Sequence, residues 1–207
     1  MPRLLFDRLS YDTTGVLGPP GGRWLLWFHG CQRSCPGCIA VDWNNAEAEY
    51  DLSLPTLLHL LDTHHPAAEG ITISGGEPFD QAAALAGLTE ALHCRGLGII
   101  IYSGFTLGEL RAAKDPDVAR VLAVTDTLID GPYLADLDDG RAFRGSSNQT
   151  LHHFTTRYLG YYSAPAERST RIEKNGGVYT LTGIPTQHAR DEWLSLKFSE
   201  GEMVHDP

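Results

Sequence analysis

The sequence predicts an α/β protein with a mainly parallel sheet, either open or partly curled into a barrel. Two observations carry this prediction. Four short apolar runs suit strands that are buried on both faces, and helical patterns separate them. Because strands alternate with helices, we expect right-handed βαβ units. With 207 residues and 42% hydrophobic content, the chain can bury one substantial core.

The individual elements follow in order along the chain. Strands are expected over 24–28 (WLLWF), 71–74 (ITIS), 98–102 (GIIIY) and 121–130 (VLAVTDTLID). Helices are expected over 54–65 and 80–95, and Gly96 is a plausible stop for the second. A third helix should begin at Thr106, which has the spacing of a capping box with Glu109.

The chain continues past this pattern. We expect a principal domain over 1–157 and a C-terminal extension over 158–207 that packs on this domain. The extension contains two β-like runs about an Asn175-Gly176 turn, then a short helix near 189–196. This β-hairpin either extends the sheet or forms a lid over one open side.

Composition excludes several classes of function. The formal net charge of −10 lacks the basic surface that phosphate neutralisation needs, so we expect no nucleic-acid partner. No apolar stretch approaches the roughly 18 residues of a membrane span, and the first residues do not resemble a signal peptide. We therefore expect a soluble, cytoplasmic protein without a membrane partner. Four cysteines are too few for a disulfide scaffold, so the thiols are available to metal.

Polar and glycine residues follow each apolar run, where ligands bind in parallel sheets. Glycines permit close backbone approach, and Glu77 places a carboxylate there that could receive an ammonium group. Alone, a glycine pair before a proline is also an ordinary βα turn. The candidate binding residues are Gly75, Gly76, Glu77, Pro78, Ser103, Gly104 and Asp130.

Three of the four cysteines, Cys31, Cys35 and Cys38, stand directly after the first run with the spacing C-x3-C-x2-C. Tetrahedral zinc needs a fourth ligand, and we expect Cys94 to be buried as a small hydrophobe instead. An iron–sulfur cluster with three thiolates leaves one iron open to a substrate or cofactor. A Pro36-Gly37 turn would bring Cys35 and Cys38 to one centre. A structural zinc site is the alternative.

The cysteine loop followed by GGEP resembles the radical S-adenosylmethionine (SAM) superfamily. The order of GCQRSCPGC, GGEPFDQ, YSGFTLGEL, LIDGPYLADL and RGSSNQ is similar to the glycyl radical enzyme activases of the anaerobic ribonucleoside-triphosphate reductase type, which carry a 4Fe-4S single cluster domain. The resemblance covers roughly residues 25–151. It implies a partial (β/α) barrel and a radical SAM catalytic domain over 1–157, whereas the tail resembles no activase segment.

The resemblance also implies roles for the candidate residues. Cys31, Cys35 and Cys38 would ligate a [4Fe-4S] cluster and would be the catalytic residues, and SAM would bind the open iron. Gly75, Gly76 and Glu77, followed by Pro78, would hold the methionine amino end of SAM. Ser103 and Gly104 would lie near its carboxylate or ribose, and Asp130 would face the cofactor.

The implied activity is that of an oxidoreductase. The reduced cluster would cleave SAM to methionine and a 5′-deoxyadenosyl radical, which would install a glycyl radical on an anaerobic ribonucleotide reductase or a related enzyme. An electron donor such as flavodoxin or ferredoxin is implied. One alternative is a radical SAM enzyme that modifies a peptide or small molecule directly. The other is a zinc-bound, non-catalytic interaction protein.

Several further residues have competing interpretations. Arg23 resembles an arginine that precedes the first strand in such activases, although PPGGR is an imperfect match. The segment from Arg144 to Gln149 would either grip the partner or SAM, or cap a helix. His29 either shields the cluster or only packs. The pairs His64-His65 and His152-His153 are expected on the solvated surface, because adjacent histidines do not share a helical face.

Overall fold

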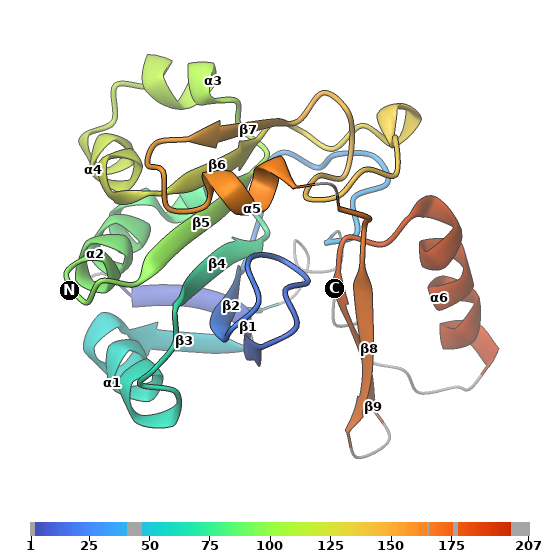
Figure 1. Ribbon diagram of the computed structural model, residues 1–207, viewed down its shortest axis with the longest axis horizontal. Coiled ribbons are helices and arrows are strands. Elements are labelled where there is room, and N and C mark those ends of the chain that lie inside the picture. The colour runs from blue at the N-terminus through green and yellow to red at the C-terminus, as the bar shows by residue number, and fades with distance from the viewer. Residues whose placement is uncertain (1–2, 41–46, 165, 176–177, 200–207) are drawn as a thin grey trace.

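The computed structural model describes residues 3–40, 47–164, 166–175 and 178–199 (Figure 1). Its centre is a seven-stranded sheet with the order β3-β1-β2-β4-β5-β6-β7. The strands are β1 (Arg3–Asp12), β2 (Arg23–Phe28), β3 (Tyr50–Ser53), β4 (Gly70–Gly75), β5 (Gly98–Ser103), β6 (Thr127–Asp130) and β7 (Thr150–His153). The fold is therefore α/β, as predicted, with a mixed sheet.

The central strands β2, β4, β5 and β6 are parallel, and β1, β3 and β7 add antiparallel pairings at the two sides. Phe28 of β2 pairs with Gly75 of β4, and Ser103 of β5 pairs with Asp130 of β6. These pairs place the carboxyl ends of neighbouring strands at the same level. The prediction that four strand-end loops share one edge of the sheet is confirmed.

One sequence prediction for this sheet was wrong, and three strands were missed. Residues 121–124, expected in a strand, belong to helix α4 (Pro116–Val124), and β6 holds only the last four residues of the predicted run. Asp115 caps this helix by accepting from the Asp117 and Val118 backbone N–H groups, and Pro116 takes its first position. Strands β1, β3 and β7 were missed because charged and polar side chains interrupt their apolar pattern.

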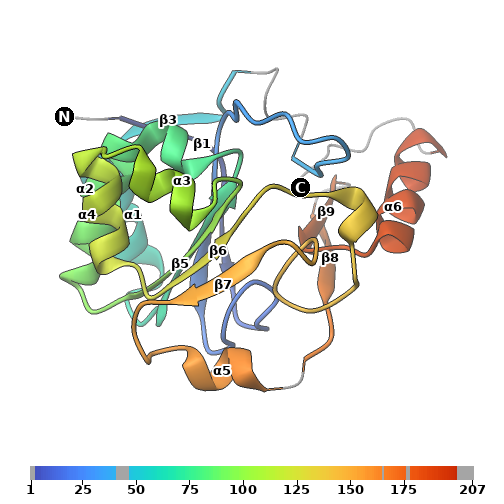
Figure 2. The same ribbon diagram turned by 90° about the horizontal axis from the view of Figure 1, so that it is seen from above.

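Helices cover one face of the sheet: α1 (Leu54–His64), α2 (Ala82–His93), α3 (Leu107–Ala112) and α4 (Figure 2). The predicted capping box of α3 is present, with reciprocal bonds between Thr106 and Glu109. A single turn of 3-10 helix, η2 (Pro78–Gln81), precedes α2. Cys94 caps the end of α2 and is exposed, not buried as expected, because Leu92 takes the inward-facing position.

The two faces of the sheet have different cores. Leu26, Phe28, Ile73 and Ile101 pack under the helices in the larger cluster. On the other face, Leu25 and Trp27 pack in a smaller cluster with Leu17 and Ala40. Ile100 and Ile129 pack there with Tyr158, next to the short helix α5 (Leu159–Ser163). This less covered face leaves room for a cavity at its carboxyl edge.

The C-terminal segment forms the predicted hairpin and helix. Strands β8 (Thr170–Asn175) and β9 (Val178–Gly183) pair with each other as a separate two-stranded sheet, so the hairpin does not extend the main sheet. The predicted Asn175-Gly176 turn falls partly outside the described residues. Helix α6 (Gln187–Ser199) follows, on the side of the molecule away from α1–α4 (Figures 1 and 2). Among the described residues, no helix is both long and apolar enough to cross a membrane.

Arg23 lies at the start of β2, at the opposite end from the cysteines, and its side chain is completely buried. It forms an ion pair of 2.5 Å with Glu69 and donates to the Thr72 hydroxyl and the Ile71 carbonyl oxygen. Arg23→Met should lower the free energy of unfolding by about 3 kcal/mol, because a buried pair loses one partner. Urea unfolding measures this change.

The exposed pair between Arg95 and Asp62 provides the control for Arg23. Arg95→Met should change the free energy of unfolding by less than about 0.5 kcal/mol. Iron content after cluster reconstitution should be unchanged in both variants. Loss of the cluster in Arg23→Met alone, at unchanged stability, would contradict the structural role given to Arg23.

Candidate functional site

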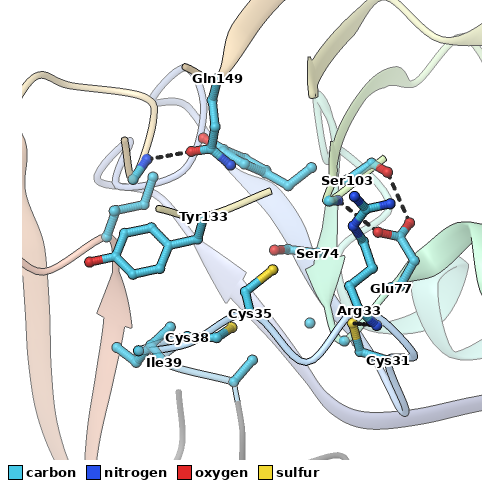
Figure 3. Close-up of a pocket in the computed structure, with 18 of the residues that line it drawn as sticks. Cys31, Arg33, Cys35, Cys38, Ile39, Ser74, Glu77, Ser103, Tyr133 and Gln149 are labelled. Atoms are coloured by element: carbon cyan, nitrogen blue, oxygen red, sulfur yellow. Dashed lines mark hydrogen bonds between the residues drawn. The ribbon is translucent and has the colours of Figure 1, made fainter. Parts of the chain in front are cut away.

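A cavity of about 180 Å³ opens at the carboxyl ends of the parallel strands (Figure 3). Its lining comes from the loops that follow β2, β4, β5 and β6, and from the C-terminal segment. The lining includes the sequence-predicted residues Cys31, Cys35, Cys38, Gly75, Gly76, Glu77, Ser103 and Gly104. The topology thus brings together eight of the ten predicted site residues.

The cysteine loop is shaped by the turn that the sequence predicted. Gly37 has a φ of 76°, a left-handed conformation that favours glycine, and the Cys38 N–H donates to the Cys35 carbonyl oxygen at 3.1 Å. The Arg33 N–H donates to the Cys31 sulfur at 3.4 Å. Cys35 and Cys38 are therefore joined by one closed turn, with Cys31 in the same loop.

The three thiols of the loop suit an iron–sulfur cluster. Burial raises the pKa of Cys31 and Cys38, and Cys35 and Cys31 raise the Cys38 pKa further through their charge. Three neighbouring thiolates therefore need a cationic centre to balance them. A [4Fe-4S] cluster, which spreads its ligands over separate irons, fits this loop.

The glycine pair is required by the cysteine loop itself. A Cβ atom on Gly75 would lie 2.4 Å from the Phe28 backbone, and one on Gly76 would lie 2.0 Å from the Gly30 carbonyl oxygen. The Gly76 N–H donates a hydrogen bond of 2.7 Å to the Phe28 carbonyl oxygen, and the Glu77 N–H donates one of 2.7 Å to the Gly30 carbonyl oxygen. The glycines therefore let the second strand-end loop lie directly against the first. This close approach is to protein backbone, whereas the sequence pattern was interpreted as an approach to a ligand.

Glu77 is completely buried and connects two of the strand-end loops. Its Oε1 atom accepts from the Phe79 N–H and the Ser103 hydroxyl, each at 3.0 Å, and Oε2 accepts from the Gly104 N–H at 2.7 Å. These bonds fix the carboxylate at the cavity wall (Figure 3). Pro78 is buried as the first residue of η2 and lies outside the cavity lining.

Asp130 also lies outside the described lining of the cavity; its neighbour Gly131 takes that place. Its carboxylate accepts from the Leu107 N–H and lies 3.0 Å from His152 Nε2.

His152 and His153 are half-buried, and His153 contacts the Thr127 hydroxyl at 3.1 Å. The expectation of solvated surface was wrong for this pair, because strand β7 packs it against β6.

The segment 144–149 closes the cavity wall instead of capping a helix. Gln149 lines the cavity, and its side chain accepts from the Gly145 N–H at 2.7 Å and donates to the Gly131 carbonyl oxygen at 2.8 Å. Arg144 forms an ion pair of 2.6 Å with Asp139.

His29, adjacent to the cysteine loop, pairs with Asp7 at 2.8 Å. His64 and His65 are both exposed, as expected, and the His65 ring stacks on the ring of Tyr11.

Sequence reasoning missed several lining residues. Arg33 lies between two of the cysteines, and its guanidinium is 4.6 Å from the centre of the Phe105 ring. Its place in the cysteine loop was a signal that could have identified it. Tyr133, Ile184, Pro185 and Arg190 also line the cavity. Tyr133 lies in the LIDGPYLADL motif just after β6, which was a signal for it, whereas the other three come from a distant segment whose pattern gives no indication of this location.

The carboxyl group of Glu77 should make stability depend on pH. Burial raises the Glu77 pKa from 4.5 to about 7, despite opposing hydrogen bonds from Phe79, Gly104 and Ser103. A raised acid pKa favours folding below pH 4.5, and this contribution is lost as the pH rises through about 7. The expected loss is up to about 3 kcal/mol.

Urea unfolding of the full-length chain between pH 4.5 and 8 measures this dependence. In Glu77→Gln, which has no proton to release here, the free energy of unfolding should fall less over the same range. Equal pH dependence in the two proteins would show that Glu77 does not titrate in this window.

Comparisons with known proteins agree with this geometry. Residues 16–152 match the family described as "4Fe-4S single cluster domain". The chain is 30% identical over 152 residues to the anaerobic ribonucleoside-triphosphate reductase-activating proteins of Escherichia coli K12 and Salmonella typhi, covering 70% of this chain and 96% of theirs. It is 29% identical over 93 residues to the pyruvate formate-lyase-activating enzyme of Staphylococcus epidermidis, covering 42% of this chain and 37% of that one.

Among solved structures, the chain is similar to QueE from Escherichia coli. The TM-score is 0.42 with 18% sequence identity, over 50% of this chain and 53% of that chain.

Proposed function

The chain belongs to the 4Fe-4S single cluster domain family, and we propose that it is a radical SAM enzyme that installs a glycyl radical on an anaerobic ribonucleotide reductase or a related enzyme. The observation that carries this proposal is the cavity where the three-cysteine loop meets the glycine and Glu77 loop. The long match to reductase-activating proteins, 96% of their length, supports the assignment to an activase.

The cofactors are a [4Fe-4S] cluster and SAM. Cys31, Cys35 and Cys38 would each ligate one iron, leaving the fourth open for SAM. When bound, the reduced cluster supplies the electron that cleaves SAM and yields a 5′-deoxyadenosyl radical. One turn holds Cys35 and Cys38, Cys31 lies in the same loop, and all three would hold the cluster at the wall of the cavity that the other loops line.

The remaining wall would orient SAM. Gly75, Gly76 and Glu77 would lie at its methionine amino end, because the Glu77 carboxylate is the acidic group of the wall and has lone pairs beyond its three hydrogen bonds. Ser103 and Gly104 would lie near the carboxylate or ribose. Asp130, which holds the start of α3, would act on this wall indirectly.

The protein substrate would reach the cavity from its open side. A partial barrel, with a gap between β7 and the N-terminal strands, would leave room for the glycine loop of the partner enzyme. The catalytic domain would span 1–157, with 158–207 as an extension. A flavodoxin or ferredoxin would supply the electron.

Anaerobic reconstitution with iron and sulfide tests the proposed function. After reduction, addition of SAM should change the electron paramagnetic resonance of the cluster and produce 5′-deoxyadenosine. Addition of an anaerobic ribonucleotide reductase should give a glycyl radical signal. 5′-Deoxyadenosine without a glycyl radical would favour direct modification of a peptide or small molecule. No cluster, with about one tightly held zinc per chain, would overturn the enzyme assignment.

A further inference from the structure

The C-terminal segment 166–199 follows the part of the chain that the family describes, residues 16–152. The segment therefore lies beyond the residues that match the 4Fe-4S single cluster domain family. Nevertheless, Ile184, Pro185 and Arg190 from this segment line the cavity beside the cysteines. The segment thus reaches the site of the proposed chemistry.

Arg190 contacts the cysteine loop from this C-terminal segment. Its Nη1 atom donates to the Gly37 carbonyl oxygen, and Nη2 donates to the Cys38 carbonyl oxygen at 3.5 Å. Both carbonyls belong to the turn that joins Cys35 to Cys38. A guanidinium group presents several donors in a fixed plane, so it can hold two adjacent carbonyls at once.

The segment that carries Arg190 is itself fixed to the main body. The Arg168 side chain is only 3% exposed; it pairs with Asp138 at 2.8 Å and donates to the Arg144 carbonyl oxygen at 2.7 Å. At the hairpin, Arg171 pairs with the buried Asp12 at 2.6 Å. A buried ion pair with additional hydrogen bonds gives a defined geometry. The anchored segment therefore presents Arg190 at a set distance from the cysteine loop.

We propose that Arg190 is a positioning residue for the cluster-binding turn and that the stretch from Ile184 to Arg190 forms a built-in wall of the cluster site. This inference rests on the proposed function for the identity of the cluster. By bonding the Gly37 and Cys38 carbonyls, Arg190 fixes the backbone between two ligands. Its positive charge beside the loop also favours the reduced, more negative state of the cluster.

The first experiment measures the rate of amide hydrogen exchange at the turn in the absence of the cluster. Hydrogen exchange of the full-length, metal-free chain is followed by mass spectrometry for the peptide that covers residues 31–40. In Arg190→Met, amide exchange at the Cys35–Cys38 turn should be about tenfold faster, because the hydrogen bonds from a charged group are lost. Arg190→Lys, which keeps the charge but not the planar pair of donors, should be intermediate.

His188 supplies the control on the same helix. Its side chain is 85% exposed and lies 3.4 Å from Glu192 of the same helix. His188→Met should leave exchange of the turn unchanged. Equal exchange in wild type, Arg190→Met and His188→Met would overturn the positioning role. This result does not depend on whether the chain binds a cluster, so it is separable from failure of the proposed function.

The second experiment measures the reduction potential of the reconstituted cluster. Arg190→Met should shift the one-electron potential to more negative values by about 59 mV, which corresponds to a tenfold change in the equilibrium constant. Arg190→Lys should retain most of the wild-type potential. An unchanged potential in Arg190→Met, with normal cluster content, would overturn the electrostatic part of the inference. Failure of every protein, including wild type, to bind iron would instead overturn the proposed function.

Discussion

Replacing any one of Cys31, Cys35 and Cys38 by alanine is expected to abolish the [4Fe-4S] cluster and with it SAM cleavage. Each thiol would ligate a different iron, so a variant lacks one of the three protein ligands. Iron and sulfide content, visible absorbance and 5′-deoxyadenosine formation after anaerobic reconstitution measure the effect. We expect near-complete loss in all three assays, because no other cysteine lies in the cavity lining.

Cys94→Ala is the matched control for the cysteine variants. Cys94 is exposed at the end of α2, on the helical side of the sheet. The cluster and SAM cleavage should match wild type in this variant. If Cys94→Ala lost the cluster while a variant of the trio retained it, the ligand assignment would be wrong.

Glu77→Ala is expected to keep the cluster but to weaken SAM binding by at least tenfold. The substitution removes the acceptor for the Ser103 hydroxyl and for the Phe79 and Gly104 N–H groups. Buried donors left without a partner cost about 1–3 kcal/mol each, so the loop after β5 should lose its fixed position. Equilibrium binding of SAM to the reconstituted protein, with iron content measured in parallel, tests the expectation.

Ser103→Ala should weaken SAM binding less than Glu77→Ala does. It removes one of the three donors and leaves the carboxylate bonded to two backbone N–H groups. SAM affinity should therefore fall less than in Glu77→Ala. Unchanged SAM affinity in Glu77→Ala, with a stable fold and a full cluster, would reject the role given to this carboxylate.

The central strands and the shared edge could be predicted because their signals are local. Strands β2, β4 and β5 are buried on both faces, so they appear as continuous apolar runs. Parallel connections then place the ends of these strands at one edge, which brought the cysteine, glycine and Ser103 loops together. The Pro36-Gly37 turn is equally local, since glycine supplies the positive φ that the turn needs.

Other features could not be predicted because they depend on partners far away in the chain. Cys94 has an apolar neighbourhood in sequence, yet the orientation of α2 exposes it. The His152-His153 pair is half-buried because β7 adds to β6, and nothing near the histidines signals that pairing. Gly75 and Gly76 were expected to allow close approach of a ligand, and the backbone atoms they approach lie at the end of β2 and in the loop that follows it.

The chemistry of the site can be recognised in the sequence: three thiols at cluster spacing, with a glycine and carboxylate loop after the next parallel strand. These follow from residue type and short-range spacing. The groups that complete the cavity depend on tertiary packing. Arg190 lies 153 residues from Gly37 in the chain but donates to its carbonyl oxygen, because the anchored hairpin returns α6 to the strand-end edge. Contacts at such separation depend on the packing of whole elements, which no local pattern records.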